Sequence, residues 1–205
     1  MAMLNQLPDV YIAGENAGMI GGLYNLYQKR LISIAESTEE YKNAPKVGPW
    51  WHHPIKEDLM DNIIRAYVAA SIGLSASFSR SSSLVGFKDI HFEIPHLDYL
   101  LTLFPCAKVI VNVRRDVAAQ HESHFQKRTT IKKLVERNAR YKEWADRHSD
   151  RVFQIALEDF NAENMTKLAN WLGFDHCRYL GVVHTNGGRA EEARGVDPSN
   201  VVCEV

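Results

Sequence analysis

The sequence predicts an α/β fold in which helices flank a parallel sheet. Three features favour this class: short apolar runs of strand length, stretches with apolar residues at helical spacing that alternate with them, and turn residues between the two. A chain of 205 residues can bury one core well but is short for two, so we expect a single domain over residues 1–205. With 45% hydrophobic residues, 24% charged residues and a formal net charge of -1, the composition argues against a disordered or generally nucleic-acid-binding chain.

The N-terminal part of the chain predicts a strand, a helix and a long loop, in that order. Val10–Ala13 is a short apolar run between Pro8-Asp9 and Gly14, which indicates a strand. Apolar residues then recur at helical spacing from Met19 to Ile34, which predicts a core-facing helix. The pattern stops at Ser37–Pro54, where prolines and glycine predict a loop. This loop carries Trp50, Trp51, His52 and His53, which we expect to border a substrate.

The middle of the chain predicts alternating helices and strands. Residues 59–67 define a second helix that ends near Gly73, and the serine-rich residues 75–83 form a connector. The clearest strands are residues 84–88 and 109–113, separated by a short helix around residues 97–104. We therefore expect these two strands to pair in parallel through a right-handed crossover.

The C-terminal part continues the alternation and ends in a tail. Helices are expected at about residues 117–126 and 131–147, followed by a strand at residues 152–156. Residues 162–172 predict a further helix with Gly173 at its C-terminal end. Residues 186–205 are interpreted as a loop or tail.

The cysteine content and the apolar runs bear on the location of the protein. Cys106, Cys177 and Cys203 are odd in number and widely spaced, so the sequence suggests neither a disulfide framework nor a cysteine metal site. No window approaches the roughly 20 apolar residues of a membrane span, and the N-terminus lacks a secretory signal. We therefore expect a cytoplasmic protein in a reducing compartment.

The most informative segment lies around Arg114-Arg115-Asp116, directly after the apolar strand 109–113. Ser123 follows Arg115 by eight residues, within the next expected helix. A guanidinium, a hydroxyl and helix N-terminal N–H groups in this order can surround one phosphate. From Lys108 to Lys142, ten Lys and Arg residues stand against three acidic residues, a local excess of 10 − 3 = +7 that suits an anionic ligand.

Several short segments occur in an order that resembles the sulfotransferase family, closest to the branch of tyrosylprotein and related bacterial enzymes. They are Pro8-Asp9-Val10, Gly14-Glu15, Lys88-Asp89, Phe104-Pro105, Arg115-Asp116 with Ser123, Glu158-Asp159-Phe160 and Trp171-Leu172-Gly173-Phe174. The resemblance covers most of the chain. It implies a three-layer parallel sheet of the P-loop NTPase-like sulfotransferase type, with the first strand and its loop missing. It also implies transfer of a sulfuryl group from 3′-phosphoadenosine 5′-phosphosulfate (PAPS) to a hydroxyl or amine.

The resemblance assigns roles to individual residues. Arg115 and Ser123 would hold the 3′-phosphate of PAPS, where the planar fork of arginine can meet two phosphate oxygens at once. Lys88 would stabilise the transferring group. Glu15 would be the base, although the tyrosylprotein enzymes place their base at the position of Asn16. The alternatives for the base are His52, His53 and His91, and Arg189 and Arg194 could fold over the nucleotide. No metal is implied. His121 and His124 are three residues apart and do not have the spacing of a zinc-protease motif.

One expected part of such an enzyme is not found in the sequence. The family binds the 5′-phosphosulfate with a Ser-Gly-Thr-type loop that precedes the Pro8-Asp9-Val10 segment, and no other phosphate-cradling glycine pattern occurs. We expect a chain that is truncated relative to the family. The alternative is a catalytically impaired homologue that acts as a nucleotide-binding or protein-interaction module. The acceptor stays open among sugars, lipids, peptides and small phenols, and the oligomeric state is equally open.

Overall fold

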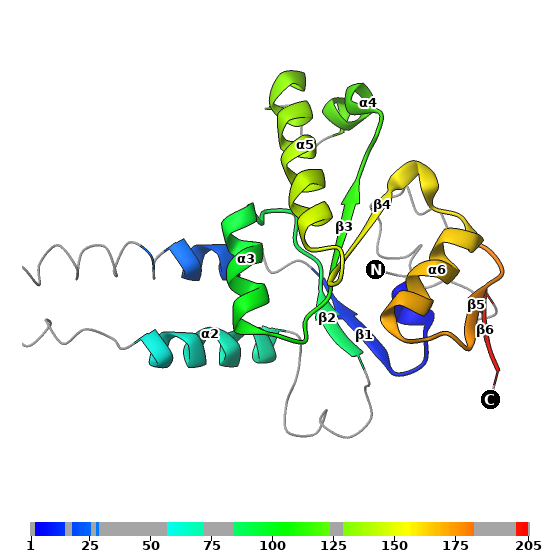
Figure 1. The fold of residues 1–205 in the computed structure, drawn as a ribbon, viewed down its shortest axis with the longest axis horizontal. Coiled ribbons are helices and arrows are strands. Elements are labelled where there is room, and N and C mark those ends of the chain that lie inside the picture. Colours follow the sequence, from blue (N-terminus) through cyan, green and yellow to red (C-terminus); the bar gives the residue numbers. More distant parts are fainter. Residues whose placement is uncertain are drawn as a thin grey trace, which may run out of the picture. The chain divides into compact units, whose positions relative to one another are not determined.

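The structure is a computed structural model that describes residues 3–14, 18–25, 28, 57–71, 84–123, 129–182 and 200–204. The chain divides into two compact units (Figure 1). One unit comprises Met1–Val10 together with Phe104–Val205, and the other comprises Tyr11–Leu103. Each unit is described by itself below, and the single domain expected from the chain length stays a prediction.

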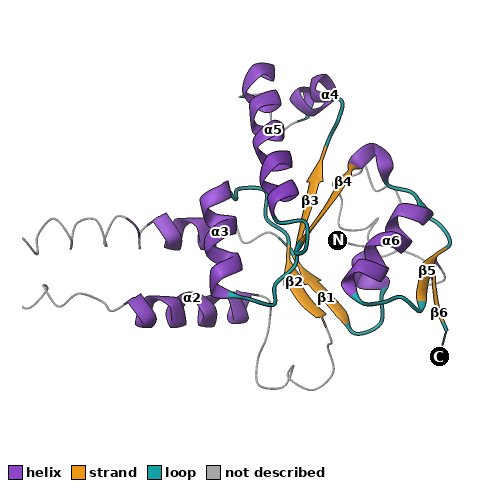
Figure 2. Ribbon diagram, viewed as in Figure 1, coloured by secondary structure: helices purple, strands orange, loops and turns teal. Residues whose placement is uncertain are grey.

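Helices and a pair of strands make up the unit Tyr11–Leu103. Strand β1 (Val10–Ala13) pairs with β2 (Leu84–Phe87), and the amide of Lys88 continues the pairing by donating to the carbonyl of Ala13 at 3.1 Å. The helices are α2 (Glu57–Ser71), α3 (Ile94–Leu103) and a helical segment at residues 19–25 (Figure 2). Strands β1 and β2 and helices α2 and α3 were expected from the sequence, within a few residues at their ends, and the helix expected from Met19 to Ile34 begins as expected but lies outside the described residues in its later part.

The buried side of α3 forms the core of this unit. Its buried side chains are His96, Leu97, Leu100, Leu101 and Leu103. The Nδ1 atom of His96 accepts from the amide of Glu93 at 3.0 Å, so this buried ring has a hydrogen-bond partner. A Cβ atom at Gly21 would lie only 3.2 Å from the His96 ring, so glycine lets the helical segment approach α3 closely. The hydroxyl of Tyr99 in α3 donates to the carboxylate of Asp61 in α2 at 2.6 Å.

A parallel strand pair organises the other unit. Strand β3 (Val109–Val113) pairs in parallel with β4 (Val152–Ala156), in a register that sets Val109 opposite Val152 and Val113 opposite Ala156. The connection contains α4 (Val117–Glu122) and α5 (Ile131–Arg147). Helix α5 buries Leu134, Trp144 and Ala145, which are at most 1% exposed.

The last part of this unit contains a helix and two short strands. Helix α6 (Ala162–Leu172) begins at Asn161, whose side chain accepts from the amide of Asn164, and ends at Gly173 with a left-handed φ of 105°. Strands β5 (Cys177–Tyr179) and β6 (Val201–Cys203) pair antiparallel. Short 3₁₀ helices lie at Leu4–Gln6 (η1) and Leu157–Asp159 (η3). Because β6 is a strand, the interpretation of residues 186–205 as a loop or tail was wrong for Val201–Cys203.

The cysteine prediction was also wrong. Cys177 and Cys203 stand directly opposite each other in β5 and β6, and their sulfur atoms are bonded at 2.02 Å. Only Cys106 is free, and it is exposed. The wide spacing of the two cysteines did not indicate this bond, because antiparallel pairing brings together two residues separated by 26 positions.

The α/β class is confirmed, with a parallel pair at β3 and β4. Among the described residues β2 pairs with β1 and β3 with β4, and the expected pairing of residues 84–88 with residues 109–113, which would join the two compact units, stays a prediction. No helix in the described part of the chain has the length and apolar character needed to cross a membrane.

Candidate anion-binding site

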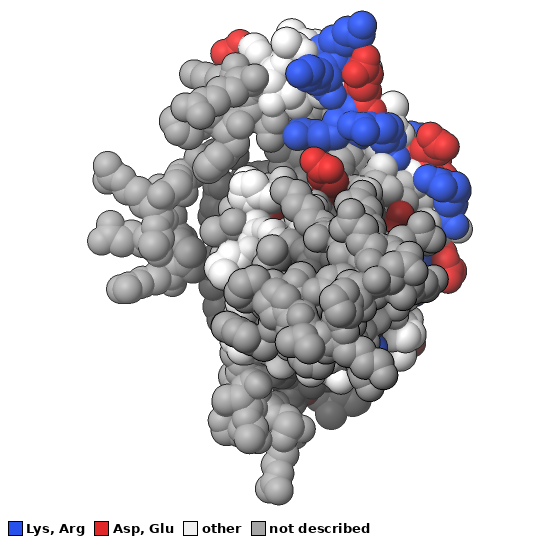
Figure 3. Space-filling model, turned by 90° about the vertical axis from the view of Figure 1, so that its left-hand side faces the viewer, with Lys and Arg blue, Asp and Glu red and all other residues white. Residues whose placement is uncertain are grey.

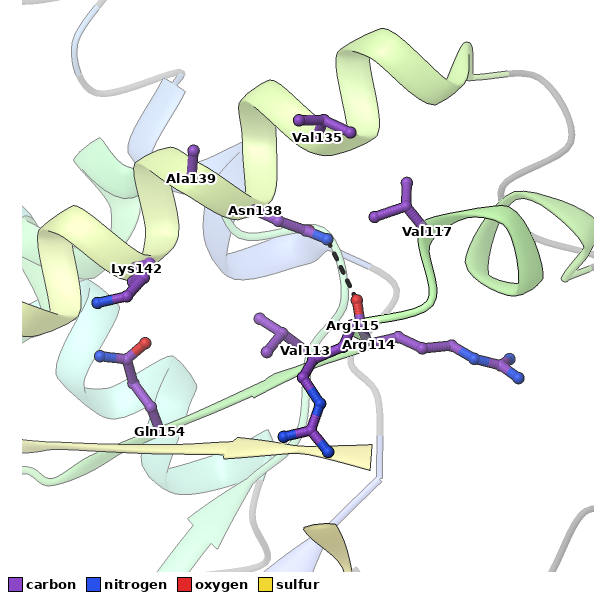
Figure 4. Close-up of a pocket in the computed structure, with 9 residues that line it drawn as sticks. All are labelled: Val113, Arg114, Arg115, Val117, Val135, Asn138, Ala139, Lys142 and Gln154. Atoms are coloured by element: carbon purple, nitrogen blue, oxygen red, sulfur yellow. Dashed lines mark hydrogen bonds between the residues drawn. The ribbon is translucent and has the colours of Figure 1, made fainter. Parts of the chain in front are cut away.

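A cavity of about 260 Å³ opens at the carboxyl end of β3, within the unit that contains Phe104–Val205 (Figure 4). Its lining comes from the end of β3 and the residues that follow it, from α5 and from β4. The lining residues are Val113, Arg114, Arg115, Val117, Val135, Asn138, Ala139, Lys142 and Gln154. This position matches the general location of ligand sites in open α/β folds, outside the carboxyl ends of parallel strands.

The lining of the cavity combines apolar side chains with cationic ones. Val113, Val117, Val135 and Ala139 supply apolar surface, and Val135 is 50% exposed although it is a large apolar residue. Two arginines and Lys142 supply positive charge. The volume is slightly below the roughly 300–1,000 Å³ of typical small-molecule pockets, so it suits part of a nucleotide better than a whole one.

Arg115 does not meet the cavity as a free cation. Its Nη1 and Nη2 atoms donate to the two carboxylate oxygens of Asp159 at 2.6 and 2.7 Å. This hydrogen-bonded pairing, together with the charge of Asp159, raises the pKa of the guanidinium. The Arg115 side chain is nevertheless 60% exposed, so it can be reached from solvent. In Figure 4 the guanidinium groups of Arg114 and Arg115 point in different directions, and Asn138 donates to the carbonyl of Arg114 at 3.5 Å.

Carboxylates also accept hydrogen bonds from the backbone amides at the end of β3, which we expected to bind a phosphate. Glu158 accepts from the amides of Arg115 and Asp116, each at 3.1 Å. These hydrogen bonds, first of all the one from Arg115, lower the pKa of the Glu158 carboxyl. Asp116 caps α4 itself by accepting from the amide of Ala119 at 2.8 Å. The amides of Arg115 and Asp116 thus bind one carboxylate, that of Glu158, while the Arg115 guanidinium binds another, that of Asp159.

Ser123 lies after the last residue of α4 and not within the helix. Its hydroxyl donates to the carbonyl of Gln120 at 2.7 Å, and Ser123 is the C-terminal cap of α4. Neither Ser123 nor Gln120 lines the cavity. The structure thus gives Arg115 and Ser123 different hydrogen-bond partners. Their joint grip on one phosphate stays a prediction.

A second group of polar residues lies at the end of β2, in the unit Tyr11–Leu103. The Asp89 side chain is fully buried, and its Oδ1 atom accepts from the amide of His91 at 2.7 Å and lies 3.1 Å from Nδ1 of the His91 ring. The Oδ2 atom of Asp89 is buried and has no hydrogen-bond partner. The His91 side chain is 53% exposed, and Gly18 approaches it so closely that a Cβ there would lie 3.3 Å away. Lys88, the expected catalytic lysine, is exposed beside this pair.

The Asp89–His91 pair has the arrangement of a proton acceptor held by a carboxylate. A carboxylate at Nδ1 favours the tautomer that carries its proton there and leaves Nε2 free to accept one. Sequence reasoning had His91 as an alternative base but missed its partner. The signal was present, because Asp89 precedes His91 by two residues directly after a strand.

Several other expected site residues lie outside the described residues. They are Glu15, His52, His53, Arg189 and Arg194, together with the tryptophans Trp50 and Trp51. Their roles stay predictions.

The positive excess expected for residues 108–142 is offset by acidic residues from elsewhere in the same unit. Lys142 donates to Asp146 at 2.6 Å, and the Arg115 guanidinium donates to Asp159 as described above. Gln154 also donates to Asp146, at 3.0 Å. On the face drawn in Figure 3, Lys and Arg side chains accordingly lie among Asp and Glu side chains. The sequence count missed this because it ended before Asp146.

The comparisons with known proteins add no family assignment. No protein-family model matches the chain, and no curated protein shows significant similarity to it. The resemblance to sulfotransferases therefore depends on the ordered motifs.

Proposed function

We propose that the chain is a sulfotransferase that binds PAPS, with the cavity at the end of β3 receiving part of the nucleotide. The observation that carries the proposal is that the backbone amides of Arg115 and Asp116 bind the Glu158 carboxylate and the Arg115 guanidinium binds the neighbouring Asp159, beside a largely apolar cavity. A group of donors that already binds carboxylates has the geometry to bind another anion. A three-layer, P-loop-like sheet and the hold of Ser123 on the 3′-phosphate are parts of this proposal.

Binding of a phosphate at Arg115 requires that Asp159 release the guanidinium. Both partners are partly exposed, with 60% of the Arg115 and 38% of the Asp159 side chain accessible, so solvent screens the pair and exchange of one anion for another is feasible. Asp159 then acts as a competitor for the site. Removing its charge should strengthen anion binding, whereas removing Arg115 should weaken it.

The proposed reaction breaks the bond between sulfur and the oxygen that bridges to the nucleotide phosphate, and it forms a bond from sulfur to the acceptor oxygen or nitrogen. Lys88 stabilises the charge that develops on the departing oxygen. The acceptor proton goes to a base. Among the described residues we assign this role to His91, because Asp89 holds its Nδ1 atom at 3.1 Å; Glu15, His52 and His53 remain the alternatives. This reaction needs no metal.

Isothermal titration calorimetry with adenosine 3′,5′-bisphosphate tests the binding site. We expect the wild type to bind, Arg115→Ala to bind at least tenfold more weakly, and Asp159→Asn to bind more tightly than the wild type. Arg147→Ala is the matched control, because Arg147 is an exposed arginine of α5 that does not line the cavity. Equal affinities for the wild type and Arg115→Ala would refute the assignment.

A catalytically inactive binding module is the second candidate. The pairing of Arg115 with Asp159 favours it, because both terminal nitrogens of the guanidinium already donate to a carboxylate within the chain. The site therefore forms without a bound nucleotide. Transfer of labelled sulfate from PAPS to a panel of phenol, sugar and peptide acceptors separates the two. Turnover that Lys88→Ala abolishes supports the enzyme. Nucleotide binding without turnover on any acceptor supports the module.

The cytoplasmic location expected from the sequence is also a proposal, and the disulfide weighs against it. Structural disulfides persist in oxidising compartments and are rare in the cytosol. Labelling of free thiols in protein taken directly from cells under acid quench decides the matter. Three reactive thiols per chain support the cytoplasm, and one, at Cys106, supports an oxidising compartment.

A further inference from the structure

A cluster of three potential metal ligands lies at the β5–β6 pair, apart from the sites described above. One ring nitrogen of His176 and the sulfur atoms of Cys177 and Cys203 all lie within 4.8 Å of one another. His176 directly precedes β5, and Cys177 stands opposite Cys203 in the antiparallel register. The pairing of β5 with β6, extended by the hydrogen bond from the amide of Glu204 to the carbonyl of His176 at 3.0 Å, fixes these positions.

We propose that these three residues form a zinc site when the Cys177–Cys203 disulfide is reduced. In the disulfide both sulfurs are bonded to each other, and neither can act as a thiolate ligand. A phosphine or thiol reductant supplies two electrons, the S–S bond breaks, and two protons convert the sulfurs to thiols. With a phosphine, water supplies the oxygen of the phosphine oxide. Zn²⁺ then displaces the two thiol protons and forms two Zn–S bonds, with no further change of oxidation state.

The geometry fits zinc with a modest local adjustment. Zinc–sulfur bonds of about 2.3 Å and zinc–nitrogen bonds of about 2.0 Å place the ligand atoms of a tetrahedral site roughly 3.3–3.8 Å apart. The nitrogen, within 4.8 Å of both sulfurs, therefore lies within reach, and the sulfurs have to move to about 3.8 Å from each other once their bond is broken. Side-chain rotation can supply such a displacement, because the thiols are no longer tied to each other once reduced. The two thiolates and the imidazole are ligands that zinc prefers.

Burial and charge at the cluster also suit an entering metal. Cys177 is buried, Cys203 is half-buried and His176 is exposed, so the site has a closed side and an open side. Asp175 lies beside the ring, with its Oδ1 atom 3.6 Å from Nδ1 of His176. The negative charge of this carboxylate favours the approach of a cation. Water would complete the coordination on the exposed side.

The proposal makes the disulfide and the metal alternatives for one pair of sulfurs. Reduced protein binds zinc, and oxidised protein does not. The outcome is independent of whether the chain transfers sulfate, because neither Arg115 nor His91 takes part.

Zinc binding to the full-length protein in both redox states tests the inference. The protein is reduced with a water-soluble phosphine, freed of reductant under inert gas and titrated with Zn²⁺ against a chromophoric chelator. We expect one zinc ion per reduced chain with an affinity in the submicromolar range and none per oxidised chain. Cobalt should give the visible absorption of a tetrahedral thiolate site on the reduced protein.

Three variants sharpen this test. Cys203→Ser and His176→Ala should weaken zinc binding about tenfold or more, whereas Cys106→Ser, which removes the one free and exposed cysteine, should leave it unchanged. If Cys203→Ser fails to fold, zinc binding is measured instead on reduced wild type whose thiols have been blocked by alkylation. Absence of zinc from the reduced wild type, zinc on the oxidised protein, or loss of zinc in Cys106→Ser would each overturn the proposal.

Discussion

Removal of the Cys177–Cys203 bond should destabilise the unit that contains it by an amount set by the length of the loop. The bond closes a sequence separation of 26 residues. The loss of loop entropy in the unfolded chain is then worth about 3.5 kcal/mol at 25 °C on the chain-entropy model. We therefore expect Cys203→Ser to lower the free energy of unfolding by about this amount. With a urea dependence of about 2 kcal/mol/M, the unfolding midpoint falls by about 1.7 M.

Urea unfolding followed by circular dichroism and tryptophan fluorescence measures the effect. A chelator is present throughout, because zinc bound to reduced protein would restore stability by mass action. Cys106→Ser is the matched control and should unfold at the wild-type midpoint, since Cys106 is free and exposed. A change below about 1 kcal/mol in Cys203→Ser, or an equal change in Cys106→Ser, would refute the argument from loop closure.

Three further changes follow from contacts in the same unit. Leu134→Ala, at a fully buried position of α5, should cost about 2–5 kcal/mol in thermal or urea unfolding, and a cost under about 1 kcal/mol would mean that the site is not packed as described. Asn161→Ala removes the N-terminal cap of α6 and should cost about 1 kcal/mol by the same measurement, while Asn161→Ser should retain most of the stability. Glu158 has a lowered pKa, so its contribution is fully present above its ordinary value of 4.5 and is lost as the pH falls through the folded value. Glu158→Gln should accordingly show a smaller loss of stability on acidification, and an unchanged pH profile would contradict this role.

The elements with strong local signals were predictable from the sequence. The bounds of β3, β4, α5 and α6 agree with those expected, because apolar periodicity and end signals coincide there. Helix α5 starts after Thr130, which caps it, and α6 ends at a glycine with positive φ. Local rules of this kind act over a few residues and survive in any tertiary context.

Features that depend on distant residues were not predictable in this way. Strands β5 and β6 are three residues each, and only their pairing makes them strands. The site shows the same limit. Arg115 and Glu158-Asp159 were each recognised as motifs, but nothing local indicated that the acidic pair would bind the arginine and its backbone across the parallel strands. Lys88 and Arg115 belong to separate compact units, so local sequence patterns do not predict the distance between them.

The order in which the two compact units can be completed follows from one hydrogen bond. The hydroxyl of Tyr179 donates to the carbonyl of Met3 at 2.6 Å, across a separation of 176 residues. Met3 therefore meets this partner only after Tyr179 has been synthesised. Tyr11–Leu103 is continuous in sequence and has all its own residues by Leu103, so it can assemble while translation is still under way. The other unit is completed later, because it combines Met1–Val10 with Phe104–Val205, which lie on either side of Tyr11–Leu103 in the sequence.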